Sequence, residues 1–109
     1  MISFAELKIE KKILKAIEEL GFQTPMPVQE KVIHHLINNE TRDLIGLAQT
    51  GTGKTAAFGL PLIQNTNTSK KKTQYLILAP TRELCLQIAD DLTSFAKYVD
   101  DINIAAVFG

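Results

Sequence analysis

The sequence is poor in cysteine and aromatic residues: it holds one cysteine, Cys85, no tryptophan and an aromatic content of 6%. A single cysteine cannot form an intramolecular disulfide, which excludes a disulfide-stapled fold and favours a reducing compartment. No apolar run approaches the roughly eighteen residues that a membrane helix needs. The N-terminus also lacks the basic segment and apolar core of a signal peptide. We therefore expect a cytoplasmic protein that does not enter a membrane.

Neither sign of charge is in excess, because 12 Lys and Arg residues balance 12 Asp and Glu residues. Zero net charge gives no argument for binding to nucleic acid, so any such argument must come from a local site. The three lysines at 70–72 lie in a polar stretch, where a solvated loop is the more ordinary interpretation. The remaining composition, 45% hydrophobic and 22% charged over 109 residues, is typical of one small globular domain.

Apolar residues recur at helical spacing in four segments. The pattern predicts helices over 9–20, over 27–38, from near 53, and over 83–98. Gly21 is suited to end the first helix and Pro27 to begin the second. Gly59 and Pro61 are poor helix-interior residues, so we expect the third helix to be short or kinked. Short apolar runs predict buried strands at 44–48, 75–79 and 102–108. Helices between consecutive strands favour an α/β fold with a mostly parallel sheet.

One stretch between a predicted strand and a predicted helix has the composition of a phosphate-binding loop. It consists of Ala48, Gln49, Thr50, Gly51, Thr52, Gly53, Lys54 and Thr55. The two glycines let the backbone approach an anion closely, and the helix that follows adds the positive end of its dipole. Lys54 is suited to the β- and γ-phosphates and the Thr55 hydroxyl to Mg²⁺, which makes both residues catalytic candidates. The loop predicts a nucleotide with Mg²⁺ but does not identify the base. A glycine turn with a stray lysine is the alternative.

Two further segments accompany this loop. Residues 21–29 read Gly-Phe-Gln-Thr-Pro-Met-Pro-Val-Gln, with a lone Phe4 upstream, and residues 80–84 read Pro-Thr-Arg-Glu-Leu. In order and spacing, the three segments resemble the Q motif, motif I and motif Ia of the DEAD-box ATP-dependent RNA helicases, along the whole chain. The resemblance implies a parallel-sheet P-loop NTPase fold of the RecA-like kind, with residues 1–109 as a truncated N-terminal ATP-binding part. Residues 1–40 would be its Q-motif helical region and residues 41–109 the first part of its α/β core.

The resemblance implies that the Q motif recognises the adenine of ATP. Gln29 would read the N6 and N7 edge of the base with its amide, and Phe4 and Phe22 would lie against the ring. For Phe4, a terminal apolar residue packed on the first helix is the alternative. Met26 stands where the family usually has Thr or Ser, and loss of such a hydroxyl cap costs about 1 kcal/mol. We expect Gln29 to compensate by bonding back to the backbone.

The resemblance also implies that Pro80, Thr81 and Arg82 contact the sugar–phosphate backbone of RNA without reading its sequence. For Arg82, an ion pair with Glu83 is the structural alternative. Cys85 stands where the family usually has alanine, and we expect it to be a small buried residue. The sequence does not identify a particular RNA or a protein partner.

The 109 residues contain neither the acidic Asp-Glu-Ala-Asp segment nor the Ser-Ala-Thr segment of the family. Because phosphoryl transfer depends on positioned charge, we expect the chain by itself not to hydrolyse ATP. Three functions remain open: part of an ATP-dependent RNA helicase, a non-catalytic module that binds adenine nucleotide or a partner, and another P-loop NTPase or kinase. In the family, other strands lie between those at 44–48 and 75–79. We therefore expect an incomplete sheet and a chain prone to associate.

Overall fold

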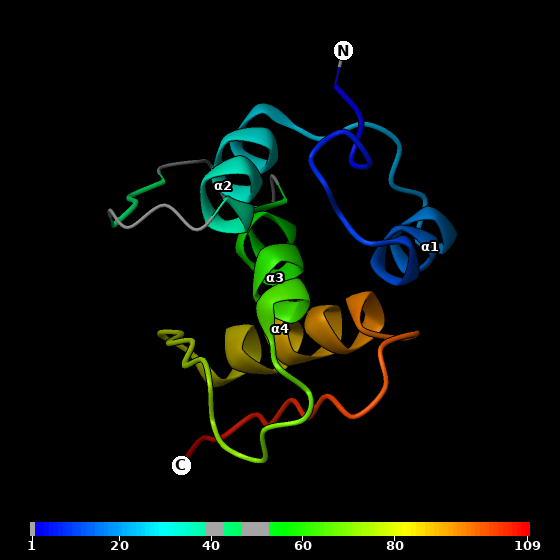
Figure 1. The fold of residues 1–109 in the computed structure, drawn as a ribbon. Helices are drawn as coiled ribbons and strands as arrows, with labels where there is room; N and C mark the ends of the chain where they lie inside the picture. Colours follow the sequence, from blue (N-terminus) through cyan, green and yellow to red (C-terminus); the bar gives the residue numbers. More distant parts are fainter. Residues whose placement is uncertain (1, 39–42, 47–52) are drawn as a thin grey trace.

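The structure, a computed structural model, describes residues 2–38, 43–46 and 53–109. Four helices occur in this described part: α1 (Lys11–Glu19), α2 (Pro27–Ile37), α3 (Lys54–Asn65) and α4 (Arg82–Phe95). α3 is the central element, because it packs against α2 and against α4, while α1 packs against α4 (Figure 1). None of these helices is long and apolar enough to cross a membrane. All four helices were predicted, with bounds that differ by a few residues.

Local signals at the ends of α1 and α2 act as predicted. Gly21 follows α1 with a φ of 91°, in the left-handed region that favours glycine. Pro27 is the first residue of α2, where its missing N–H costs nothing. Met26 precedes it, and its backbone N–H donates to Gln29 Oε1 at 2.8 Å. This bond confirms that Gln29 compensates for the missing hydroxyl cap.

α3 runs through Gly59 and Pro61 for 12 residues, so of the two expectations, a short or a kinked third helix, the short one is wrong. A Cβ at position 59 would lie 2.6 Å from Leu92 Cδ2, so glycine allows α4 to approach α3 closely. Pro61 is fully buried and contributes its ring to the packing. Tertiary packing thus outweighs the low helix propensity of the two residues.

The core lies where the four helices meet the N-terminal segment 4–9. Ile13, Ile33 and Leu60 are its most deeply buried members, each 0% exposed. The cluster further contains Phe4, Leu7, Ile9, Ile17, Ala56, Ile63, Leu92, Phe95 and Ala96. Because full burial of one large aliphatic side chain stabilises a fold by about 1.5–3 kcal/mol, this cluster is what holds the helices together.

The three predicted strands do not pair in the described residues. Residues 44–46, 75–79 and 102–108 all lack strand structure, so the prediction of strands there is wrong, whereas the expectation of an incomplete sheet is confirmed for the described part of the chain. Leu47 and Ala48, the rest of the first predicted strand, lie outside the described residues. The physical reason is that a strand exists only where a neighbouring strand takes its N–H and C=O groups, and these segments do not take those of one another.

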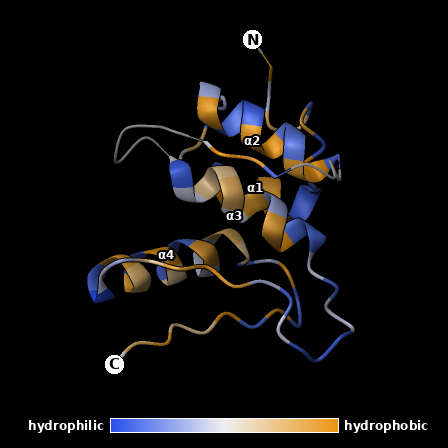
Figure 2. Ribbon diagram, turned by 90° about the vertical axis from the view of Figure 1, so that its left-hand side faces the viewer, coloured by the Kyte–Doolittle hydropathy of each residue, from blue (hydrophilic) through white to orange (hydrophobic). Residues whose placement is uncertain are grey.

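Segments 75–79 and 102–108 nevertheless keep the two-residue alternation of a strand. Ile77 and Ile104 pack against the helical core. Leu76, Leu78 and Val107 point the other way and are 80%, 84% and 84% exposed. Figure 2 shows that the C-terminal stretch, beside α4, is largely apolar. One face of each of these two segments is therefore covered by helices, and the opposite face is open.

Candidate nucleotide and RNA site

The described part of the predicted phosphate loop is Gly53 with the first turn of α3. Gly53 has a φ of 79°, again in the left-handed region, and its carbonyl oxygen accepts from the Ala57 N–H at 3.2 Å. Lys54 is exposed and Thr55 is half-buried. The start of the helix, an ammonium group and a hydroxyl thus follow one another directly. The other predicted loop residues, Ala48, Gln49, Thr50, Gly51 and Thr52, lie outside the described residues.

Gln29 joins the Q-motif turn to this loop. Its side chain is 3% exposed, with Oε1 bonded to the Met26 N–H and Nε2 donating to the Gly53 carbonyl oxygen at 3.3 Å. A Cβ at position 53 would lie 2.3 Å from Gln29 Nε2, so this approach requires glycine. The amide keeps a second hydrogen and a second lone pair, which are the two groups that the adenine edge needs. The sequence did not reveal that Gln29 and Gly53 are bonded.

The two predicted adenine-contacting rings lie against each other. The ring centroids of Phe4 and Phe22 are 6.0 Å apart, and Phe22 also makes an edge contact with Phe95 of α4, with centroids 5.9 Å apart. Phe4 is 4% exposed and belongs to the core, which is the position that the alternative interpretation gave it. Phe22 is half-buried and is the more accessible ring. Stacking of either ring on adenine stays a prediction.

The predicted RNA-contacting residues lie at the start of α4. The Thr81 hydroxyl oxygen accepts from the Leu84 N–H at 3.2 Å and caps the helix. Pro80 and Arg82 are exposed beside it. The helix start therefore presents backbone N–H groups and a guanidinium next to each other, a combination suited to phosphate oxygens.

The last residues of the chain lie against this helix start. The Arg82 guanidinium lies over the Phe108 ring, with 4.6 Å between Cζ and the ring centroid. The described residues show no ion pair between Arg82 and Glu83, so that alternative is wrong. Cys85 is half-buried, with Sγ 4.0 Å from the Val107 carbonyl oxygen. The cation–π contact and the thiol contact both join α4 to residues 107–108.

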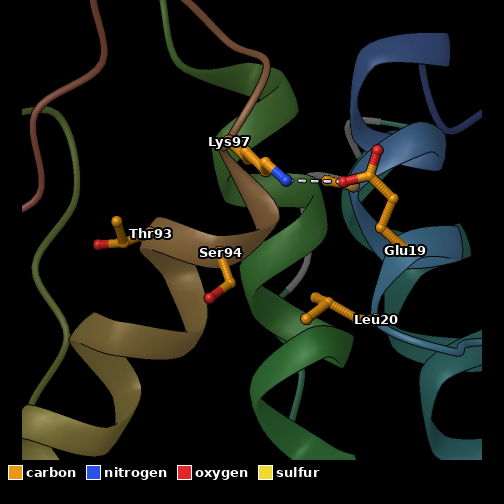
Figure 3. Close-up of a pocket in the computed structure, with 6 residues that line it drawn as sticks. Glu19, Leu20, Thr93, Ser94 and Lys97 are labelled. Carbon is orange, nitrogen blue, oxygen red and sulfur yellow. Dashed lines mark hydrogen bonds and ion pairs between the residues drawn. The ribbon is translucent and has the colours of Figure 1, made fainter.

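A pocket of ≈ 390 Å³ between α1 and α4 was not foreseen from the sequence. Lys97 Nζ and Glu19 Oε1 form an ion pair at 2.8 Å across it (Figure 3), and the Tyr98 hydroxyl donates to the other carboxylate oxygen. The hydrogen bond from Lys97, followed by that from Tyr98, lowers the pKa of Glu19. The bond to Glu19 raises the pKa of Lys97. The ion pair therefore links α1 to the end of α4. Because its two charges neutralise each other, Glu19 and Lys97 leave no unpaired charge in this pocket for a ligand.

The remaining candidate sites are a second pocket, possible metal-binding clusters and the three lysines at 70–72. A depression of ≈ 260 Å³ lies beside the Q-motif turn, lined by Ile2, Thr24, Pro25, Pro27 and Glu30. In the described part of the chain, no group of three or more His, Cys, Asp and Glu residues could hold a metal ion. Lysines 70–72 are exposed, as expected for a solvated loop.

Comparison with known sequences identifies relatives over nearly the whole chain. Residues 26–109 match the model of a family described as DEAD/DEAH box helicase. The chain is 48% identical over 107 residues to ATP-dependent RNA helicase DeaD of Escherichia coli strain K12, covering 98% of this chain and 17% of DeaD. It is 44% identical over 109 residues to ATP-dependent RNA helicase CshA of Listeria monocytogenes, covering 100% of this chain and 20% of CshA. The chain therefore spans a fifth or less of the length of these relatives.

Solved structures show the same fold. A DEAD box protein from Methanococcus jannaschii matches with a TM-score of 0.82 and 41% identity, over 87% of this chain and 26% of that one. S. cerevisiae Dbp5 bound to RNA and ADP BeF3 matches with a TM-score of 0.85 and 37% identity, over 90% of this chain and 25% of that one. The predicted fold class is thereby confirmed: the chain corresponds to part of a parallel-sheet P-loop domain of the RecA-like kind, although its strand segments do not pair with one another.

Proposed function

This chain belongs to the DEAD/DEAH box helicase family, and we propose that it forms the adenine-nucleotide site and the first RNA contact of an ATP-dependent RNA helicase. The names of the relatives DeaD and CshA support this assignment. The match to the helicase family over residues 26–109 argues against the alternative of a nucleotide kinase. Because the chain covers 17% of DeaD, we assign ATP hydrolysis coupled to RNA unwinding to a protein that contains these residues together with the rest of the helicase.

The bond between Gln29 and Gly53 is the observation that carries the nucleotide assignment. It places the predicted adenine-reading amide next to the last glycine of the phosphate loop, so base and phosphates would bind to one connected unit. The close approach at Gly53, which a Cβ would block, fits this arrangement. Lys54 would contact the β- and γ-phosphates and the Thr55 hydroxyl would bind Mg²⁺. Bound ATP with Mg²⁺ supplies the phosphoryl group whose transfer drives a helicase.

The aromatic rings take different parts in this proposal. Phe22, half-buried on the Q-motif turn, would contact the adenine face. Phe4, which is 4% exposed, would support Phe22 from the core side. Phe22 would thus bind the adenine directly, and Phe4 would act through its packing on Phe22.

The start of α4 would bind the RNA backbone. Thr81 caps the helix with its hydroxyl, which leaves the N–H groups of the first turn and the Arg82 guanidinium for phosphate oxygens. The solved complex of Dbp5 with RNA and ADP BeF3 supports RNA as the ligand of this family. Because these contacts reach phosphates and sugars only, the binding would be insensitive to RNA sequence.

The alternative of a non-catalytic binding module applies to the 109 residues taken alone. They contain no Asp-Glu-Ala-Asp segment, so the acidic charge that the family places near Mg²⁺ is not among them. We therefore propose that this chain by itself binds adenine nucleotide without hydrolysing ATP. A cytoplasmic location is also proposed, supported by the unpaired Cys85.

Calorimetric titration with Mg²⁺–ADP and Mg²⁺–GDP tests the nucleotide assignment. We expect ADP to bind more tightly, and Gln29→Ala to erase that preference, because a bidentate contact is worth about 1–3 kcal/mol of discrimination. Gln74→Ala is the matched control, since Gln74 also makes two bonds to backbone, both to Asn67, in a loop outside the proposed site. Equal affinities of the unsubstituted chain for ADP and GDP would contradict the proposal.

A further inference from the structure

Gln64, near the end of α3, is bonded to the backbone of the N-terminal segment. Its Oε1 accepts from the Glu10 N–H at 2.9 Å, and its Nε2 donates to the Lys8 carbonyl oxygen at 2.8 Å. The side chain thus uses both halves of its amide on two backbone groups that are more than fifty residues away in sequence. No sequence motif pointed to this residue.

The segment that Gln64 holds is a fixed turn. Lys8 has a φ of 70°, in the left-handed region that a residue with a side chain rarely adopts. The Lys8 N–H donates to the Ala5 carbonyl oxygen at 3.0 Å, and the Glu6 N–H donates to the Ser3 hydroxyl oxygen at 3.1 Å. Such a conformation persists only where surrounding contacts hold it, and the two bonds from Gln64 act at the end of this turn.

The turn carries Phe4 into the core and against the Q-motif turn. Phe4, Leu7 and Ile9 are 4%, 5% and 4% exposed, so the whole segment is anchored by its apolar side chains. Phe4 then packs on Phe22, with centroids 6.0 Å apart. A continuous set of contacts therefore runs from Gln64 through residues 4–10 to Phe22.

Both ends of α3 are consequently bonded through glutamine side chains to segments that flank the Q-motif turn. At the start of the helix, Gln29 bonds to Gly53. Near its end, Gln64 bonds to Lys8 and Glu10. The first bond acts on the phosphate loop, and the second acts on the segment that supports Phe22.

We propose that Gln64 is a positioning residue for adenine: it fixes the segment 4–10, so that Phe4 holds Phe22 in place for the base. This inference rests on the proposed function, in which Phe22 contacts adenine. Gln64 itself touches neither base nor phosphate in this arrangement. Its effect is specific. Loss of the two bonds of Gln64 releases the segment that holds Phe4 against Phe22, and it leaves the bond between Gln29 and Gly53 intact.

Gln74 provides a closely matched control. Its Oε1 accepts from the Asn67 N–H at 2.9 Å and its Nε2 donates to the Asn67 carbonyl oxygen at 2.9 Å. The chemistry is that of Gln64, whose two distances are 2.9 and 2.8 Å, but the bonds of Gln74 close the loop 67–74. A general effect of losing two glutamine bonds would therefore appear equally in Gln64→Met and Gln74→Met, whereas a positioning effect appears only in the first.

The experiment compares these two variants with the unsubstituted chain by amide hydrogen exchange and by titration with Mg²⁺–ADP and Mg²⁺–GDP. We expect Gln64→Met to speed exchange in residues 4–10 and to weaken ADP binding about fivefold, the scale of one lost hydrogen bond. We expect Gln74→Met to change neither. If Gln64→Met loses its helical circular dichroism, Gln64→Glu repeats the comparison, because its carboxylate still accepts from the Glu10 N–H but has no hydrogen to donate to the Lys8 carbonyl oxygen and repels it.

The outcomes separate the inference from the proposed function. Unchanged exchange in residues 4–10 of Gln64→Met, or faster exchange with unchanged ADP affinity, would overturn the positioning role while the preference for ADP stands. Equal ADP and GDP binding by the unsubstituted chain would overturn the proposed function, and the inference with it. Equal losses of ADP affinity in Gln64→Met and Gln74→Met would also overturn the inference, because they indicate general destabilisation.

Discussion

Leu60 and Leu78 are the same residue type in two regions with opposite surroundings. Leu60 lies on α3 and is 0% exposed, whereas Leu78 lies in the extended segment 75–79 and is 84% exposed. A helix satisfies its own backbone, so α3 needs only apolar partners to be stable. An extended segment needs a neighbour for its backbone as well as its side chains, and segment 75–79 has helices on one face only. The comparison shows that, among the described residues, the helices have partners for their apolar faces and the extended segments do not.

Truncation of these two leucines should have very different effects, which tests the comparison directly. We expect Leu60→Ala to lower the free energy of unfolding by about 2–5 kcal/mol, because it leaves a cavity among fully buried side chains. Leu78→Ala should change it by less than about 0.5 kcal/mol, because the side chain is already in water. Urea denaturation followed by circular dichroism measures both variants. Similar losses in the two variants would mean that the segment 75–79 is buried in solution, for example against a second copy of the chain.

Helix boundaries could be predicted from the sequence because short-range signals set them. Gly21 ends α1, Pro27 begins α2 and Gly53 precedes α3, each through the backbone conformation of a single residue. The length of α3 could not be predicted, because the close approach of Leu92 makes Gly59 favourable where propensity alone disfavours it. The packing partner belongs to another helix and leaves no local trace in the sequence.

The candidate site was predictable as a set of residues but not as a set of contacts. The motifs pointed to Gln29 and to Gly53 separately, yet the bond between them joins residues 24 positions apart. The same limit applies to Gln64 with Lys8, and to Glu19 with Lys97. The prediction of a strand at 75–79 failed for a related reason, since apolar alternation does not show whether a neighbouring strand is present; only the family resemblance indicated that neighbours would be missing.

The ion pair between Glu19 and Lys97 should have the smallest effect, because both side chains are substantially exposed, at 40% and 59%. The pKa of Glu19 is lowered from 4.5, so its contribution to stability is present above pH 4.5 and is lost as the pH falls through the lowered value. The pKa of Lys97 is raised from 10.5, so its contribution is present below pH 10.5 and is lost as the pH rises through the raised value. In urea denaturation measured as a function of pH, we expect Glu19→Gln to remove the decrease in the free energy of unfolding that the ion pair causes below pH 4.5.

Glu18→Gln, an exposed neighbour on α1, is the control for this pH dependence. In this variant the free energy of unfolding should fall at acid pH as it does in the unsubstituted chain. If the free energy of unfolding of Glu19→Gln falls at acid pH as much as that of the unsubstituted chain, the ion pair does not join α1 to α4 in solution.

The central claim is that Gln29 connects an adenine-reading turn to the phosphate loop, and the side-chain amide resonances of Gln29 test it most directly. In an NMR titration of the nitrogen-15-labelled chain with Mg²⁺–ADP, we expect the Gln29 Nε2 hydrogens to shift, because one of them would gain a new acceptor on the base. Mg²⁺–GDP should move them less, and the amide of Gln74 should stay in place with either nucleotide. Gln29 resonances that remain unmoved at saturating ADP would contradict the account.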